Sequence, residues 1–465
     1  MIALYLSGHG FGHMTRACEV LAEVRRLDPS VPLAVVGTVP EPLVRRAIPG
    51  ELLFRRATCD VGLVQRDALR VDEERTAEAC AAFDAGWEVR AREEEAWLRT
   101  VGARLVLADI PAMPFDAARR AGLPAVGLGN FSWDWIYRHL SRRIPSLAAS
   151  ADRAARAYAG ATLLLELPFA GDLSAFPHRE RIGFVVRRPR LPRGEARRRL
   201  GLDERPAVLL SFGGVGMEGL APPHAPEFRW LTPSDVDGRI EALGLTYPDV
   251  VHAVDVVVTK PGYGIVTDAI AAGTRLVYTE RGDFPEYPVM VREMEPLLAC
   301  EHVGNEELLA GRIVEPVRRV LLRPVPPVPD LGGAERAAKR LLALLGGGAS
   351  YSVMPVILAV RDLVFRSKIL AAAERLGADV RIAPRGTPLD QAARELGPGT
   401  LIVDLGEAGV LEQVAAAKGA GATRVVGFLG HLQTDLMERS RLAGVDEVLT
   451  RGQFVQRLDD ILRGG

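Results

Sequence analysis

The feature that most constrains the fold is a repeated succession of a short apolar run, a glycine-containing turn and an amphipathic segment. "IALYLSG" leads into "HMTRACEVLAEVRRL", and "ARLVLADI" leads into "FDAARRAG". Apolar runs of strand length that alternate with helical patterns indicate a parallel sheet covered by helices on both faces. The sequence therefore predicts an α/β protein.

The rhythm divides the 465 residues into three units. Residues 1–150 and 151–345 are each predicted to form a doubly wound, Rossmann-like domain. A glycine-rich linker, 346–352, separates them from residues 353–465, where five short strands alternate with helices. That size and rhythm predict a flavodoxin-like α/β domain.

Bulk properties narrow the range of partners. A formal net charge of −1 argues against a nucleic acid or an acidic membrane as partner. The four cysteines lie far apart and lack metal-ligand spacing, which predicts buried free thiols in a reducing cytoplasm and no metal site. No apolar run approaches the roughly 20 residues of a membrane helix.

The first glycine loop, "SGHGFGHMTR", precedes a predicted helix. Gly10 and Gly12 permit a tight turn and the close approach of another molecule. The helix that follows offers free N–H groups and the positive end of its dipole. The loop also carries His9 and His13, and two histidines favour acid–base chemistry, although a tight turn with incidental histidines remains an alternative.

Asp109 follows a buried strand in "RLVLADIPAMP", at the edge of the sheet where ligands bind in parallel α/β folds. A carboxylate there is able to orient the imidazole of His13 and to stabilise its protonated form. Alternatively, Asp109 caps the turn that follows the strand.

A third segment, "GNFSWDWIY", combines aromatic faces with short polar groups. This mixture suits a sugar, which has apolar faces and many hydroxyls. The candidate acceptor-binding residues are His9 together with Asn130, Ser132, Trp133 and Asp134. The other interpretation is a partly buried loop with aromatic anchors.

The second domain has glycine loops of its own. Backbone N–H groups at Gly213 and Gly214 follow a strand and are able to hold a diphosphate. In "VVVTKPGYGIVTDAIAAG" a helix begins after a second glycine loop, where Asp268 is placed to accept hydrogen bonds from ribose. The candidate donor-binding residues are Gly10, Gly12, Gly213, Gly214, Lys260, Gly262, Gly264, Thr267, Asp268, Asp283 and Glu286.

These motifs resemble those of nucleotide-sugar glycosyltransferases with the GT-B fold. "GYGIVTDAIAAG" is similar to the donor-binding segment of the MurG-like and UDP-glucosyltransferase families. The resemblance implies that Asp268 holds the donor ribose, that His13 is the catalytic base and that Asp109 orients it. Those families usually end the second site with an acidic residue followed by glutamine, whereas this chain has Asp283 and Glu286.

Four segments also resemble the glycosyltransferase-like N-terminal portion of plant L-arabinokinase: "GHGFGHMTR", "NFSWDWIY", "KPGYGIVTDAI" and "RGDFPEYPVM". This resemblance covers roughly residues 1–345. The sequence contains no glycine–serine-rich kinase loop, so the resemblance does not imply a kinase activity.

Residues 353–465 resemble the receiver domain of two-component systems in outline. Asp404 matches the phosphorylated aspartate, but only Asp362 follows the first strand, and Arg451 stands where receivers have a lysine. The resemblance therefore implies a pseudo-receiver that serves self-association or docking of a protein partner.

Together these observations predict an inverting glycosyltransferase that moves a sugar from a nucleoside-diphosphate sugar to the hydroxyl of an unidentified acceptor, without a separate cofactor. The alternative is a non-catalytic nucleotide-sugar sensor that signals through the pseudo-receiver. A nucleotide-sugar epimerase of the same fold is a third, weaker reading.

Overall fold

The structure is a computed structural model that describes residues 1–8, 11–66, 70–212, 221–236, 238–345, 356–376, 378–397, 399–430 and 433–462. His9, Gly10, Gly213, Gly214 and the predicted linker lie outside the described residues. The chain divides into two compact units, Met1–Pro177 with Arg181–Gly348 and, separately, His178–Glu180 with Ala349–Gly465.

The strands β1 to β6 of the first unit belong to a seven-stranded sheet in the order β3-β2-β1-β4-β5-β6-β7, which is parallel from β3 to β6. Its strands are β1 (Ile2–Leu6), β2 (Leu33–Gly37), β3 (Leu53–Arg56), β4 (Leu105–Asp109), β5 (Ala125–Gly129), β6 (Leu163–Glu166) and β7 (Arg179–Arg181). Every residue of β1, β2, β4 and β5 is buried, as expected for a sheet covered on both faces. The sheet therefore continues past residue 150, where the sequence analysis ended the first domain.

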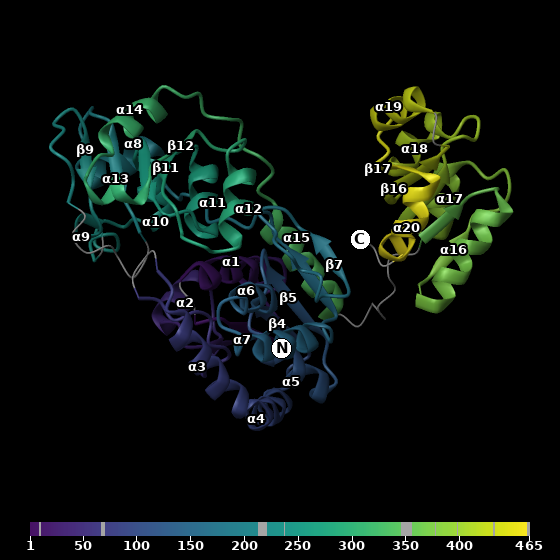
Figure 1. The fold of residues 1–465 in the computed structure, drawn as a ribbon, viewed down its shortest axis with the longest axis horizontal. Coiled ribbons are helices and arrows are strands. Elements are labelled where there is room, and N and C mark those ends of the chain that lie inside the picture. Colours follow the sequence, from purple (N-terminus) through teal and green to yellow (C-terminus); the bar gives the residue numbers. More distant parts are fainter. Residues whose placement is uncertain are drawn as a thin grey trace. The chain divides into compact units, whose positions relative to one another are not determined.

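Within the described residues, the helices α1 to α7 accompany this sheet, and Figure 1 shows them in the first lobe together with it. They are α1 (Phe11–Leu27), α2 (Glu41–Ala47), α3 (Glu73–Ala85), α4 (Trp87–Thr100), α5 (Met113–Ala121), α6 (Trp133–Leu140) and α7 (Leu147–Tyr158). Asp72 caps α3, since its side chain accepts a hydrogen bond from the backbone N–H of Arg75.

The second lobe has a five-stranded parallel sheet in the order β12-β11-β10-β8-β9. Its strands are β8 (Ala207–Leu210), β9 (Arg229–Leu231), β10 (Val256–Thr259), β11 (Arg275–Tyr278) and β12 (Cys300–His302). Its helices are α8 (Arg193–Leu200), α9 (Pro233–Val236), α10 (Tyr247–Ala253), α11 (Tyr263–Ala272), α12 (Glu286–Met294), α13 (Asn305–Leu309) and α14 (Val314–Leu321). Two parallel sheets with their helices in residues 1–345 confirm the predicted α/β class.

The last helix of this unit, α15 (Gly333–Leu345), returns to the first lobe and packs against α1 (Figure 1). Its buried face includes Ala337, Leu341 and Leu344. At its C-terminal end, Arg104 donates a hydrogen bond of 2.7 Å to the carbonyl of Leu345. The chain thus crosses between the lobes twice, which ties them together.

The second unit is a parallel α/β fold in its own right, with strand order β14-β13-β15-β16-β17. Its strands are β13 (Val356–Ala359), β14 (Val380–Ile382), β15 (Gly399–Asp404), β16 (Ala422–Leu429) and β17 (Glu447–Thr450). Its helices are α16 (Leu363–Leu376), α17 (Leu389–Leu396), the 3₁₀ turn Leu411–Gln413, α18 (Val414–Gly419), α19 (Thr434–Leu442) and α20 (Arg451–Leu462).

Cys18, Cys59, Cys80 and Cys300 are all buried free thiols, as predicted. None of the helices in the described ranges has both the length and the apolar character that a membrane crossing requires.

The start of α15 provides a test of this packing. A Cβ at Gly333 lies 2.5 Å from the backbone oxygen of Phe184, whereas one at Gly194 in α8 meets nothing within 4 Å. Gly333→Ala is expected to lower the free energy of unfolding by about 1–3 kcal/mol through overpacking. Urea unfolding followed by tryptophan fluorescence measures this, because all five tryptophans belong to the first unit.

The matched control is Gly194→Ala, which is expected to leave stability unchanged or to raise it by about 0.5–1 kcal/mol through helix propensity. Equal midpoints for the two variants would contradict the close approach of α15 to the segment around Phe184.

Candidate functional site

The carboxyl ends of β1 and β4 bring together the residues at the centre of the site. The two strands are neighbours, with Leu6 opposite Asp109, the last residue of β4. The chain leaving β1 enters α1, whose first turns carry His13 and Arg16. All three side chains are buried, and Asp109 has no exposed surface. The predicted convergence of His13 and Asp109 is therefore present.

Three donors converge on the carboxylate of Asp109. His13 Nδ1 lies 2.7 Å from Oδ1, and Arg16 donates from Nη2 to Oδ1 and from Nε to Oδ2, both at 2.7 Å. Burial alone would raise the pKa of Asp109, but the guanidinium of Arg16 and the imidazole of His13 hold it below its ordinary value. Asp109 is therefore an ionised, fully paired carboxylate.

The contact with Asp109 also sets the orientation of the His13 ring. Because Asp109 is ionised and accepts, we assign the proton of neutral His13 to Nδ1, which leaves the Nε2 lone pair as the basic position. The ring packs edge-on against Phe131, with centroids 5.4 Å apart, and lies 6.4 Å from the ring of Trp133. An imidazole held in this way has the geometry of a general base.

The polar contacts continue from the first lobe into the second. Arg16 Nη1 donates to Asn130 Oδ1 at 2.7 Å, and Asn130 Nδ2 donates to Glu286 Oε1, also at 2.7 Å. The second oxygen of Glu286 accepts a hydrogen bond of 3.0 Å from Arg281 Nη1. Asn130 and Glu286 are both buried. We call the series His13, Asp109, Arg16, Asn130, Glu286 and Arg281 the buried polar chain.

The first turns of α1 and α11 meet beside the buried polar chain. A Cβ at Gly264 lies 3.8 Å from Cα of Gly12, so these two predicted donor-binding glycines face each other. The guanidinium of Arg16 sits 5.0 Å from the centre of the Tyr263 ring. Thr267, also predicted to bind the donor, donates to the carbonyl of Tyr263 at 2.9 Å within α11.

Asp268 is buried in α11 and makes an ion pair with Arg187, a residue of the segment between the two sheets. Burial raises the pKa of Asp268 although Arg187 opposes this effect. Glu19 of α1 belongs to the same cluster, where burial raises its pKa to about 7 against the influence of Arg187. Binding of ribose by Asp268 stays a prediction, and it requires the ribose to compete with Arg187.

The remaining predicted donor residues have different surroundings. Asp283 is exposed and contacts the first lobe, through His139 Nε2 of α6 at 2.9 Å and through Arg143, which follows α6. Gly262 is the N-cap of α11. Lys260 lines a small pocket together with Arg281. Glu286, by contrast, lies within the buried polar chain.

The predicted acceptor segment lies beside His13 through the rings of Phe131 and Trp133. Ser132 Oγ donates to the carbonyl of Asp172 at 3.4 Å. Trp133 Nε1 donates to Asp60 Oδ2 at 2.8 Å. Asp134 is half-buried, and burial raises its pKa.

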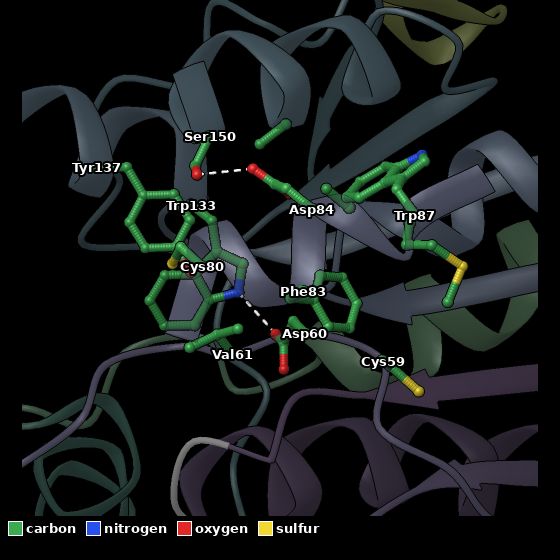
Figure 2. Close-up of a pocket in the computed structure, with 13 residues that line it drawn as sticks. Cys59, Asp60, Val61, Cys80, Phe83, Asp84, Trp87, Trp133, Tyr137 and Ser150 are labelled. Atoms are coloured by element: carbon green, nitrogen blue, oxygen red, sulfur yellow. Dashed lines mark hydrogen bonds between the residues drawn. The ribbon is translucent and has the colours of Figure 1, made fainter. Parts of the chain in front are cut away.

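A cavity of about 30 Å³, room for roughly two waters, lies beside this segment. Figure 2 shows the residues that line it. Aromatic rings of Phe83, Trp87, Trp133 and Tyr137 line it, and its carboxylates are Asp60 and Asp84. Asp84 accepts a hydrogen bond of 2.7 Å from Ser150.

Sequence reasoning did not single out Asp60, Arg16, Arg187 or Arg281. A signal existed for Asp60, which follows β3 by four residues at the same edge of the sheet as Asp109. Arg16 stands in the quoted "GHMTR" motif, one helical turn after His13. No local pattern marks Arg187, because its partner Asp268 is 81 residues away. Arg281 opens the quoted "RGDFPEYPVM" segment, five residues before its partner Glu286.

No family model matches the chain. Over 330 residues it is 30% identical to L-arabinokinase of Arabidopsis thaliana, a match that covers 67% of this chain and 31% of that protein. The chain thus spans about a third of the length of this relative.

Among solved structures, the chain is similar to CalG4, the calicheamicin glycosyltransferase, with 17% identity, a TM-score of 0.47 and coverage of 74% of this chain and 98% of that one. It is also similar to the glycosyltransferase SnogD from Streptomyces nogalater, with 17% identity, a TM-score of 0.43 and coverage of 74% and 95%.

The buried polar chain predicts different costs for two neighbouring carboxylates. Glu286→Ala removes the acceptor of both Asn130 and Arg281 from a buried place and is expected to cost about 1–3 kcal/mol of stability. Asp283→Ala removes exposed contacts with His139 and Arg143 and is expected to cost about 1 kcal/mol or less. Urea unfolding of both variants measures the difference, and equal costs would contradict the role of Glu286 in joining the lobes.

Proposed function

We propose that the protein is a GT-B-fold, inverting glycosyltransferase that transfers a sugar from a nucleoside-diphosphate sugar to an acceptor hydroxyl. The observation that carries this proposal is the buried contact of 2.7 Å between His13 Nδ1 and Asp109 Oδ1. A histidine oriented by a carboxylate, beside aromatic side chains and between two α/β lobes, is suited to deprotonating a hydroxyl.

In the proposed reaction, Nε2 of His13 takes the proton of the acceptor hydroxyl. The hydroxyl oxygen then forms a bond to the anomeric carbon, and the bond between that carbon and the diphosphate oxygen breaks. Its electron pair leaves with the nucleoside diphosphate. Asp109 stabilises the resulting imidazolium, and backbone N–H groups at the N-terminus of α11 favour the charge of the leaving group.

Two further observations support the fold part of the proposal. Residues 1–345 hold two parallel α/β sheets, and α15 returns from the second lobe to α1 of the first.

The relative of 30% identity is a kinase by name, but the match covers only 31% of it, so we do not extend kinase activity to this chain. The intact His13–Asp109 pair favours an enzyme over the sensor that the sequence left as the alternative.

The test of the base is His13→Ala. It is expected to lower turnover by about 10²-fold or more, the contribution of a general base, with nearly unchanged affinity for the nucleotide sugar. The measurement follows release of nucleoside diphosphate from a panel of UDP-, GDP- and dTDP-sugars. Asp109→Asn is a poorer probe, because it leaves the charge of Arg16 buried without its partner.

His302→Ala is the matched control, since His302 lies in β12 and pairs with Glu280 outside the buried polar chain. It is expected to retain turnover. Equal release by wild type and His13→Ala would exclude His13 as the base. Tight binding of one sugar nucleotide without any release by the wild type would instead identify a sensor.

We further propose that the second unit is a flavodoxin-like pseudo-receiver. Its strand order, second-first-third-fourth-fifth, supports this assignment. Asp404 ends β15, and its carboxylate accepts hydrogen bonds from the backbone of Gly406 at 2.9 Å and from Arg451 at 3.1 Å. Arg451 also stacks on Phe365. An arginine held in this way blocks the oxygen to which a phosphoryl group would be added.

Incubation with acetyl phosphate and magnesium is therefore expected to leave Asp404 unmodified. Intact-mass spectrometry of the wild type measures this, with Asp404→Asn as the control for phosphorylation elsewhere. An adduct of one phosphoryl group in the wild type that is missing from Asp404→Asn would contradict the pseudo-receiver.

A further inference from the structure

An ion pair occupies the carboxylate that is predicted to hold the donor ribose. Arg187 lies in the segment between the two sheets, and its Nε donates to Asp268 Oδ1 at 3.2 Å while its Nη2 pairs with Oδ2. The side chain of Asp268 is only 1% exposed. A ligand hydroxyl therefore reaches this carboxylate only when Arg187 moves away from it.

A second carboxylate lies across from this ion pair, on the first lobe. The helices α1 and α11 are in contact, and a Cβ at Gly264 lies 3.8 Å from Cα of Gly12. Glu19 stands about two helical turns after Gly12, and Asp268 about one turn after Gly264, so both carboxylates belong to the facing sides of these helices. Glu19 accordingly interacts electrostatically with Asp268 and with Arg187.

Glu19 and Asp268 differ in their pairing. Within the described part of the chain, no residue lies within hydrogen-bonding or ion-pairing distance of the Glu19 carboxylate, whereas Asp268 is paired with Arg187. Burial raises the pKa of Glu19 to about 7, and Arg187 opposes this effect. Glu19 is therefore partly protonated near neutral pH and becomes a better partner for a cation once it ionises.

The other charges near Glu19 come from the same segment and the same helix. Arg190 lowers the pKa of Glu19, and Glu23, one turn later in α1, raises it. Among these charges Arg187 has the largest effect, so it is the cation for which Glu19 and Asp268 compete. The helices α2 and α15 also pack on α1, and each contains an ion pair of its own: Arg45 with Glu41, and Lys339 with Glu335.

We propose that Glu19 is the second partner of Arg187, and that the guanidinium turns from Asp268 to Glu19 when Asp268 binds the hydroxyls of a nucleotide sugar. This exchange keeps the guanidinium paired throughout, as a charge removed from water requires. Glu19 and Arg187 are then positioning residues, because they act on the ligand through Asp268. The inference rests on the proposed function for the identity of that ligand.

A double-mutant cycle tests the second partner without any ligand. Asp268→Asn removes the charge that Arg187 pairs with, and Glu19 is expected to take its place, so the midpoint of urea unfolding falls little. In Asp268→Asn combined with Glu19→Gln the guanidinium has neither carboxylate. The midpoint is then expected to fall by more than the sum of the two single shifts. Additive shifts overturn the proposal.

The matched control for the cycle is Glu23→Gln. It removes the same charge from the same helix, where Glu23 pairs with Arg26. Combined with Asp268→Asn, it is expected to give additive shifts. An equal departure from additivity in both pairs of variants would assign the effect to general charge and contradict the exchange.

Calorimetry on the wild type and Glu19→Gln tests the exchange itself and needs no double variant. Binding of UDP-, GDP- and dTDP-glucose is measured at pH 6 in two buffers of different ionisation enthalpy. Glu19 is mostly protonated at this pH, and pairing with Arg187 ionises it, so the wild type is expected to release up to about one proton on binding. Glu19→Gln is expected to release none. Equal release by both proteins, or none by the wild type, overturns the exchange.

The two experiments separate this inference from the proposed function. The cycle needs neither ligand nor turnover, so a departure from additivity in a protein that binds and transfers no sugar refutes the proposed function and leaves Glu19 as the second partner of Arg187. Transfer of sugar by a protein with additive shifts refutes the exchange alone.

Discussion

A carboxylate without solvent exposure is the constraint on which the first unit depends. Asp109 ends a central strand, and an ionised group there is costly unless it is paired and hydrogen-bonded. Arg16 provides two of the hydrogen bonds and His13 the third contact. Since Arg16 also binds Asn130, and Asn130 binds Glu286, the pairing of one carboxylate fixes how α1 meets the second lobe.

Arg16 and Asp109 have different roles at the proposed reaction centre. Arg16 neutralises Asp109 in the resting protein, and Asp109 holds the His13 ring with Nε2 as the basic atom. Arg281 ends the buried polar chain through Glu286, so the contact between the two lobes and the orientation of the base depend on shared hydrogen bonds. A substitution at any residue of the buried polar chain is therefore expected to affect both the stability of the protein and its chemistry. Only variants outside the buried polar chain separate the effect on stability from the effect on chemistry.

The parts that the sequence predicted are those with a local or periodic signal. Apolar runs located the central strands, and the rule that parallel strands share a ligand edge placed His13 near Asp109. The continuation of the first sheet past residue 150 was missed, because the pairing of β6 with β5 is a tertiary contact. The Arg187–Asp268 and Asn130–Glu286 contacts were missed for the same reason, since 81 and 156 residues separate the partners.

The most direct test of the account is the tautomer of His13, observed by ¹⁵N NMR of protein labelled in its histidine rings, with His13→Ala assigning the signals. The contact of 2.7 Å with Asp109 predicts that the neutral form of the ring carries its proton on Nδ1 and leaves Nε2 unprotonated. A neutral ring with its proton on Nε2 would contradict the account, because that atom could not accept the proton of an acceptor hydroxyl.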